Sequence, residues 1–120
     1  MKKVLIVDDA AFMRCVIKNM LQSNGFDVIG EAENGMEGIL KYKELNPDIV
    51  TMDITMPVMS GIDALKSILE YDSKAKIVMI SAMGQEHFVK EAVMQGAKSF
   101  IVKPFKEESI VLNLNKVLAL

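Results

Sequence analysis

Four short apolar runs, each followed by a residue that can handle phosphate or metal, constrain this chain more than any other feature. Segments with helical spacing separate them, and a more polar run at residues 27–32 completes an alternation of strand and helix. Successive parallel strands need a crossover, usually a helix, so the alternation predicts a parallel sheet with helices on both faces. The four runs are Val4–Val7 before Asp8 and Asp9, Ile49–Met52 before Asp53, Ile77–Ile80 before Ser81, and Phe100–Val102 before Lys103.

The composition of the runs predicts their places in the sheet. Three of them are continuously apolar, as expected of strands covered on both faces, whereas residues 27–32 mix polar and apolar side chains and belong at an edge. The predicted fold class is α/β, a flavodoxin-like (βα)5 doubly wound parallel sheet with strand order 2-1-3-4-5, although the residues alone leave other orders open. This order brings Asp8 and Asp9 next to Asp53.

Apolar residues at helical spacing predict five helices. The first ends at Asn24–Gly25, the second spans about 35–45 and ends before Pro47, and the fourth stops at Gly96. We expect Cys15, in the first helix, to pack as a small apolar residue. The predicted buried stripes are Phe12, Met13, Val16, Ile17, Met20 and Leu21; Met36, Ile39, Leu40 and Leu45; Ile62, Leu65, Ile68 and Leu69; Phe88, Val89, Ala92 and Val93; and Ile110, Val111, Leu114, Val117 and Leu118.

Size and charge narrow the classes of function. A chain of 120 residues that is 51% apolar fits one domain, residues 1–120, without an output domain. The formal charge of -2 gives no basic footprint for nucleic acid or anionic membrane, and no apolar run approaches the ~20 residues of a membrane span. The single cysteine fits a reducing compartment, so we expect a cytoplasmic protein, and we expect a monomer.

The polar residues after the runs predict a cation site at the carboxyl edge of the sheet. Carboxylates about 4 to 5 Å apart repel by ~3–4 kcal/mol per pair at an effective dielectric near 20, so Asp8, Asp9 and Asp53 need compensation. Oxygen ligands without nearby histidine or a second cysteine favour Mg²⁺, and Mn²⁺ can substitute. Asp8 and Asp9 alone would be an ordinary strand end or helix cap; with Asp53, Ser81 and Lys103 they predict a site.

Asp53 is the predicted nucleophile, because it stands alone after the central strand and an aspartate can form an aspartyl phosphate. The turn that follows, Ile54–Pro57, could wrap the ion. Lys103 offers a positive charge to phosphate oxygens, and Ser81 offers a hydroxyl. His87 lies near a helix start without a partner histidine, so we expect it on the surface and assign it no role.

Together these residues resemble bacterial response-regulator receiver domains. The likeness covers essentially the whole chain, and it is specific because separated positions match in order, each after its own strand. Residues 8–14 and 81–85 are most similar to the stand-alone chemotaxis regulators of the family. The matching segments are Val7-Asp8-Asp9, Pro47-Asp48-Ile49-Val50-Thr51-Met52-Asp53-Ile54-Thr55-Met56-Pro57, Gly61, Ser81-Ala82 and Lys103-Pro104-Phe105.

The resemblance implies a phosphoaspartate switch. Asp53 would accept phosphate from the phosphohistidine of a kinase of the CheA type, and Mg²⁺ would be held by Asp9, Asp53 and the Thr55 backbone carbonyl, with Asp8 acting through water. Ser81 and Lys103 would contact the phosphoryl group.

The resemblance also implies an output. Phe100 matches the family's switch aromatic, the Lys103–Pro104 bond matches a position that is cis in the family, and the output surface maps roughly onto residues 84–119. The implied partner is a flagellar motor switch protein of the FliM type, with room for a dedicated phosphatase. Thr55 and Met83 occupy positions that vary in the family and influence the lifetime of the acyl phosphate, which stays open.

Three rival functions remain to be weighed. Nothing in the chain excludes a single-domain phosphorelay intermediate that passes phosphate to a histidine phosphotransfer protein. A Mg²⁺-dependent aspartyl-phosphate phosphatase enzyme of the haloacid dehalogenase type needs a second acid two residues after the nucleophile, where this chain has Thr55. A flavodoxin-like electron carrier needs hydroxyls and glycine after the first strand, where Asp8 and Asp9 would repel the phosphate of FMN.

Overall fold

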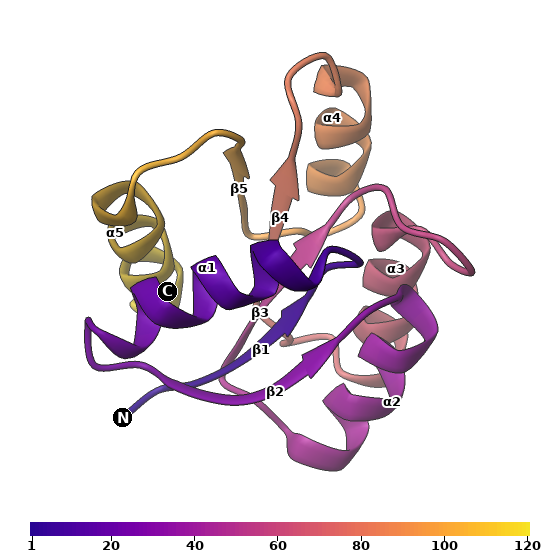
Figure 1. Ribbon diagram of the computed structural model, residues 1–120. Coiled ribbons are helices and arrows are strands. Elements are labelled where there is room, and N and C mark those ends of the chain that lie inside the picture. Colours follow the sequence, from indigo (N-terminus) through magenta and orange to yellow (C-terminus); the bar gives the residue numbers. More distant parts are fainter.

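The computed structural model describes residues 1–120 as an open sheet of five parallel strands flanked by five helices (Figure 1). The strand order is β2-β1-β3-β4-β5, so both the predicted fold class and the predicted edge position of residues 27–32 are confirmed. The elements are β1 (Lys3–Val7), α1 (Ala11–Gln22), β2 (Asp27–Ala32), α2 (Gly35–Leu45), β3 (Ile49–Asp53), α3 (Gly61–Tyr71), β4 (Ile77–Ser81), α4 (Glu86–Met94), β5 (Ser99–Val102) and α5 (Glu107–Leu118).

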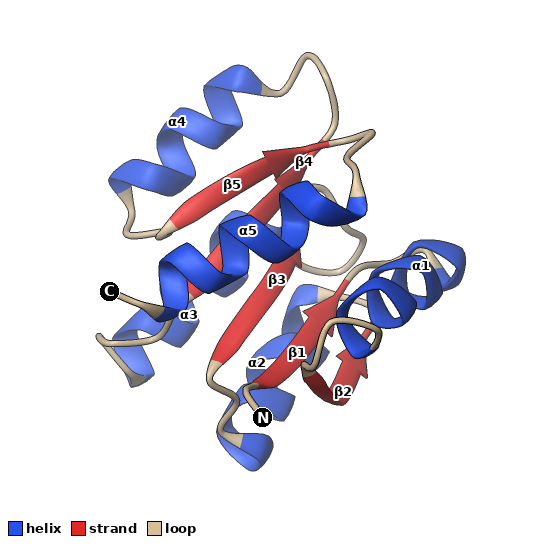
Figure 2. Ribbon diagram, turned by 90° about the vertical axis from the view of Figure 1, so that its left-hand side faces the viewer, coloured by secondary structure: helices blue, strands red, loops and turns tan.

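Two separate cores lie on the two faces of the sheet. In Figure 2, α1 and α5 cover the near face and α2 and α3 lie behind it; α4 joins the second layer. Alternate residues of each strand enter alternate cores, as the period of two requires: Val4 and Ile6 pack under α1 and α5, and Leu5 and Val7 pack under α2 and α3. This double covering explains why the central strands are continuously apolar.

The predicted helical stripes were correct at their centres and too wide at their margins. Phe12 and Met36 are exposed because they lie in the first turns of α1 and α2, which begin at the carboxyl edge beyond the last residues of the strands. Three more residues predicted to be buried are exposed: Leu40, Phe88 and Val93. Each is next in the chain to a buried residue, and so points about 100° away from it around the helix.

Cys15 is exposed on the surface of α1, so the expectation that it packs as a small apolar residue was wrong. His87 is exposed, as expected. No helix is both long enough and apolar enough to cross a lipid bilayer.

Helix ends set the loops that surround the carboxyl edge. The Asn34 side chain caps α2 by accepting a hydrogen bond from the Glu37 N–H at 2.8 Å, and the Ser60 hydroxyl accepts one from the Asp63 N–H at 3.2 Å to cap α3. The Asn34 and Ser60 caps fix where the loops after β2 and β3 stop and so hold these two loops beside the strand ends. At the opposite edge of the sheet, the C-cap of α2 is Asn46, in the left-handed conformation directly before Pro47.

Candidate functional site at the carboxyl edge of the sheet

The three predicted acids meet at the carboxyl edge. Because β1 and β3 pair in parallel, with Val7 opposite Met52, the residues that follow each strand come out side by side. Each of Asp8, Asp9 and Asp53 has a carboxylate oxygen within 4.8 Å of those of the other two. Asp8 and Asp53 are buried, at 1% and 8% exposure, whereas Asp9 is exposed. The arrangement is a cup of oxygen atoms open to solvent on one side.

Local hydrogen bonds hold Asp8 in place. Its N–H extends the β1–β2 ladder to Ala32 O at 3.0 Å, and its Oδ1 accepts a hydrogen bond from the Ala10 N–H at 2.8 Å. Arg14 donates from Nη1 to the Asp8 carbonyl at 2.6 Å and from Nε to Glu31 Oε1 at 3.2 Å. Arg14 thus ties the start of α1 to the ends of β1 and β2, a role that no pattern in the sequence indicated.

One lysine supplies the nearby counter-charge. Lys103 Nζ lies 3.5 Å from Asp8 Oδ2 and 3.7 Å from Asp53 Oδ1. Its own N–H donates to Ser81 O at 2.7 Å, which continues the β4–β5 ladder past the last strand residues. One ammonium against three carboxylates leaves the cup with excess negative charge, so these residues could hold a cation.

The pKa of the Asp53 carboxyl reflects this excess. Burial is the main cause that raises this pKa from an ordinary value of 3.8 to about 6, and the negative charge of Asp8 is the next. The positive charge of Lys103 lowers the pKa. The charge of Asp9 and a hydrogen bond with the Asp9 side chain raise it further. The cup therefore disfavours the ionised form of its central residue as long as no further cation is present.

The remaining predicted residues surround this cup unequally. Ser81 ends β4 beside β3, in a register that pairs Asp53 with Ile80, and it is buried. The Lys103–Pro104 bond is cis, as the resemblance implied. Thr55 lies exposed in the loop between β3 and α3. Phe100 is different: it lies on β5, is 44% exposed, and lines a groove described below.

The model of one protein family matches residues 4–115: the response regulator receiver domain. The chain belongs to this family. Chemotaxis protein CheY of Thermotoga maritima is 60% identical over 116 residues, which cover 97% of each chain, and CheY of Bacillus subtilis is 57% identical with the same coverage. The chain is therefore a CheY-like receiver domain.

Solved structures agree with this assignment. A chain in the crystal structure of the CheX–CheY–BeF3–Mg complex from Borrelia burgdorferi superposes with a TM-score of 0.92 and is 44% identical, covering 97% of this chain and 88% of that one. The response regulator domain of Thermotoga maritima CheB gives a TM-score of 0.92 at 34% identity, covering 100% and 98%.

Gly61 lets α3 of this receiver domain begin directly against the end of β3. The Gly61 N–H donates to Ile54 O at 2.7 Å, and a Cβ atom at position 61 would lie 1.9 Å from the Asp53 carbonyl oxygen. No side chain fits in that space without moving the backbone. The glycine at position 61, one of the residues that match the family, is therefore required sterically beside Asp53.

Gln85 makes two hydrogen bonds near the site that were not predicted from the sequence. Its Oε1 accepts a hydrogen bond from the Ala82 N–H at 2.7 Å, and its Nε2 donates to Thr55 Oγ1 at 2.7 Å. The side chain therefore links the loop after β4 to the loop after β3. A glutamine in a turn has no periodicity, so no pattern in the sequence indicated this bridge.

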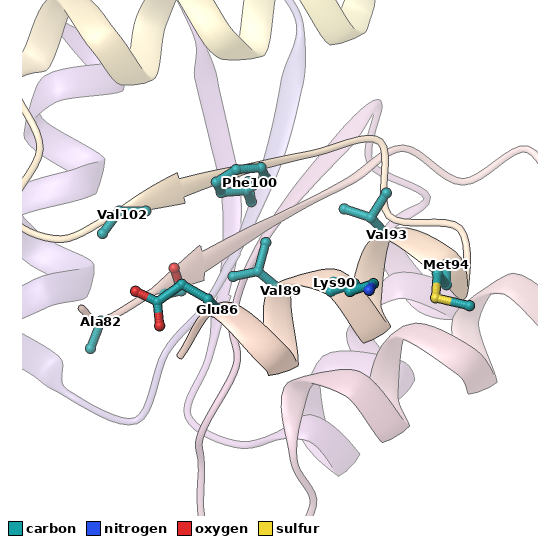
Figure 3. A pocket seen from close by; sticks show the side chains of 9 residues that line it. Ala82, Glu86, Val89, Lys90, Val93, Met94, Phe100 and Val102 are labelled. Atoms are coloured by element: carbon teal, nitrogen blue, oxygen red, sulfur yellow. The ribbon is translucent and has the colours of Figure 1, made fainter. Parts of the chain in front are cut away.

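An apolar groove of about 400 Å³ lies beside the cup, between α4 and β5 of the receiver domain (Figure 3). Phe100 and Val102 of β5 face it, opposite Val89 and Val93 of α4. Phe100 and Val102 are 44% and 40% exposed. Ser81 reaches both the groove and the strand edge that holds Asp53, so this residue joins the two regions.

Proposed function

We propose that Asp53 accepts a phosphoryl group and that the domain changes its affinity for a partner as a result. The observation that carries this proposal is the cup itself: three carboxylates within 4.8 Å of one another, with Lys103 Nζ 3.5 and 3.7 Å from Asp8 and Asp53. A buried anion with a raised pKa beside one lysine is costly for a structural role and useful for a reactive one.

We propose that Asp8, Asp9, Asp53 and the Thr55 carbonyl bind Mg²⁺, for which Mn²⁺ can substitute. The donor set supports this because it consists of oxygen atoms, which hard divalent cations prefer. The Borrelia relative was crystallised with BeF3 and Mg²⁺, which is further support. When bound, the ion would neutralise carboxylate charge and the charge of phosphoryl oxygens.

In the proposed reaction an Asp53 carboxylate oxygen attacks the phosphorus atom of a phosphohistidine. The new O–P bond forms as the P–N bond breaks, and the imidazole leaves with the electron pair of that bond and takes up a proton. Lys103 contributes positive charge at the transferred oxygens, and the Ser81 hydroxyl is free to turn toward one of them. The domain would catalyse only its own phosphorylation and dephosphorylation.

The proposed switch consists of Ser81, Phe100 and Pro104. Ser81 ends the strand beside Asp53, and its carbonyl accepts from the Lys103 N–H, so a shift of Ser81 toward a phosphoryl group would act on the end of β5. Phe100 lies on that strand at the groove. Phosphorylation can shift this equilibrium only if it favours one state over the other.

The proposed pathway is chemotaxis. Its support is the name of the relatives at 60% and 57% identity, both chemotaxis proteins. We propose a CheA-type histidine kinase as donor and a FliM-type flagellar motor switch protein as the target of the groove, in the reducing cytoplasm that the single cysteine fits. The Borrelia relative forms a complex with CheX, which supports a further partner for such a domain.

Acetyl phosphate with Mg²⁺ tests the acceptor. Intact-mass spectrometry should show one phosphoryl group on the wild type and none on Asp53→Asn, because the amide lacks the nucleophilic oxygen. Asp63→Asn is the matched control, since Asp63 is exposed on α3, and it should label normally. Undiminished labelling of Asp53→Asn would remove Asp53 from the acceptor role.

A second experiment separates chemotaxis from a phosphorelay. Phosphorylated protein is presented to a peptide of the flagellar motor switch and, separately, to a histidine phosphotransfer domain. Phosphate-dependent binding to the peptide supports the chemotaxis proposal. Transfer of the phosphoryl group to the histidine domain, without peptide binding, would contradict it.

A further inference from the structure

The backbone at the end of β4 points one N–H toward the acceptor strand. Ile80 O accepts a hydrogen bond from the Ile54 N–H at 3.1 Å and so faces β3, whereas Ser81 O accepts from the Lys103 N–H at 2.7 Å and faces β5. Successive residues of a strand direct their backbone groups to opposite sides, so the Ala82 N–H faces β3 again. It lies just past the last ladder pair, Asp53 and Ile80.

A donor at this position has no strand partner and is directed at the region above Asp53. Backbone N–H groups of this kind bind anionic oxygens well, because hydrogen bonds to a charged acceptor are strong and because the fold fixes the direction of the donor. A phosphoryl group on Asp53 would add strong acceptor oxygens within this region. The Ala82 N–H is therefore a donor that such a group would use.

In the unphosphorylated protein this donor is already occupied. Gln85 Oε1 accepts from it at 2.7 Å, and the Gln85 amide is itself held by its hydrogen bond to Thr55 Oγ1 at 2.7 Å. Gln85 is half-buried, whereas Ala82 and Thr55 are exposed. A neutral amide oxygen thus takes the place of an anionic one.

We infer that Gln85 competes with the phosphoryl group for the Ala82 N–H and must leave when Asp53 is phosphorylated. The inference rests on the proposed function of Asp53 and adds a positioning residue to it. Departure of Gln85 also breaks the bond to Thr55, so phosphorylation separates the loop after β3 from the loop after β4. The bridge that Gln85 makes between Ala82 and Thr55 would thus exist in the unphosphorylated state alone.

Beryllofluoride with Mg²⁺, a tetrahedral analogue of the phosphoryl group, tests the competition at equilibrium. Gln85→Ala should bind it about fivefold more tightly than the wild type, the factor that one hydrogen bond of ordinary net strength is worth. Gln85→Glu should bind it more weakly, because a carboxylate accepts more strongly from Ala82 and repels the anion. Opposite signs for the two variants distinguish competition from a merely structural role.

Thr55→Val isolates the other end of the bridge, since it removes the hydroxyl acceptor and keeps the backbone carbonyl. It should act in the same direction as Gln85→Ala, and the double variant should bind no more tightly than Gln85→Ala, because both changes remove one shared interaction. Gln95→Ala, which truncates an exposed glutamine at the far end of α4, is the matched control and should bind like the wild type.

The Ala82 amide resonance in ¹H–¹⁵N spectra gives an independent measurement. Before any anion is added, Gln85→Ala should shift it and speed its hydrogen exchange, and Gln95→Ala should not. The inference is overturned if Gln85→Ala leaves this amide unchanged, or if it binds beryllofluoride no more tightly than the wild type. Failure of the proposed function looks different: the wild type itself would then neither bind beryllofluoride nor take up phosphate on Asp53.

Discussion

At the carboxyl edge, the ends of β1 and β3 bury charge, whereas β5 and α4 leave apolar side chains in solvent. We call the first region, Asp8, Asp9, Asp53 and the loop from Asp53 to Gly61, the acidic half. The second, the groove between α4 and β5, is the apolar half. The acidic half is tightly packed, since a single Cβ atom cannot be added at Gly61; the apolar half holds a groove of about 400 Å³.

Each half departs from the usual distribution of residues, and in opposite senses. Burying carboxylates destabilises the folded protein unless positive charge compensates them. Exposed valine and phenylalanine side chains forgo the stabilisation that burying them would provide. Both costs are removed by binding: a cation or a phosphoryl group in the acidic half, a protein surface in the apolar half. Lys103 and Ser81 lie where the halves meet, so events in one half have a direct physical route to the other.

Gly61→Ala should produce the largest effect and shows how tightly the acidic half is packed. The new methyl group would collide with the Asp53 carbonyl, so the backbone must move, and overpacking of this kind costs about 3 kcal/mol. Urea unfolding measures the loss of stability, and acetyl phosphate labelling should slow with it. Gly38→Ala is the control, because the atoms nearest to its Cβ would belong to the Val7 side chain, at 3.1 Å, and not to the backbone. Equal losses for both variants would contradict the special fit at Gly61.

Asp53→Asn should make the metal-free protein more stable at neutral pH. The folded-state pKa of Asp53, about 6, exceeds its ordinary 3.8, so the folded protein binds more protons between these values. The cost of the charge is therefore fully present above pH 6 and disappears as the pH falls toward 4. Allowing for solvent screening, the variant should gain about 2 kcal/mol at pH 7.5 and much less at pH 4.5.

Urea unfolding in a chelator at both pH values measures this gain, with Asp63→Asn as the exposed control. A variant that gains nothing at pH 7.5 would show that the acidic half carries no electrostatic cost. The two halves would then not differ in the way that burial of charge suggests.

Asp9→Ala should weaken Mg²⁺ binding roughly 10-fold or more, because it removes a proposed ligand, and even changes to residues that support ligands cost that much. Calorimetric titration measures the affinity. Glu33→Ala, an exposed acid in the loop after β2, controls for the loss of one surface charge. Equal affinity of Asp9→Ala and wild type would exclude Asp9 from the ion site.

Val58→Asn should change stability least of these variants, because it only relieves backbone strain at one residue of the acidic half. Val58 has a φ of 70°, and the Met59 N–H donates to Pro57 O at 2.7 Å across it. A β-branched residue rarely adopts this conformation, which asparagine tolerates better. The variant should be more stable by about 1 kcal/mol in thermal unfolding. Val93→Asn, an exposed valine of the apolar half with a helical backbone, should show no such gain.

The sequence predicted the sheet almost completely because its strands are simple. A strand buried on both faces is apolar along its length, so the mixed composition of β2 predicted its edge position. The meeting of Asp8 with Asp53 depended in addition on the flavodoxin-like strand order, because the residues alone left other orders open. The margins of the helices could not be predicted in the same way. Whether Leu40 or Phe12 is covered depends on how far neighbouring elements extend, and no local pattern records that.

The site shows the same division. Side chains at strand ends are placed by topology, and Asp53 and Lys103 come together as expected, although their chemical roles stay predictions. Contacts made by loop residues depend on backbone turns that the periodicity does not describe. Gln85 and Arg14 are of this kind: both make hydrogen bonds at the site, and neither was singled out from the sequence.

The position of Lys103 has a consequence for how the chain is made. Synthesis releases the N-terminal segments first, so Asp8, Asp9 and Asp53 exist together before their neutralising lysine. On the ribosome, we expect the junction of β1 and β3 to stay weak near these acids until a divalent cation or the last strand arrives. The strand β5 lies at an edge of the sheet. It can therefore be added last without separating strands that are already paired.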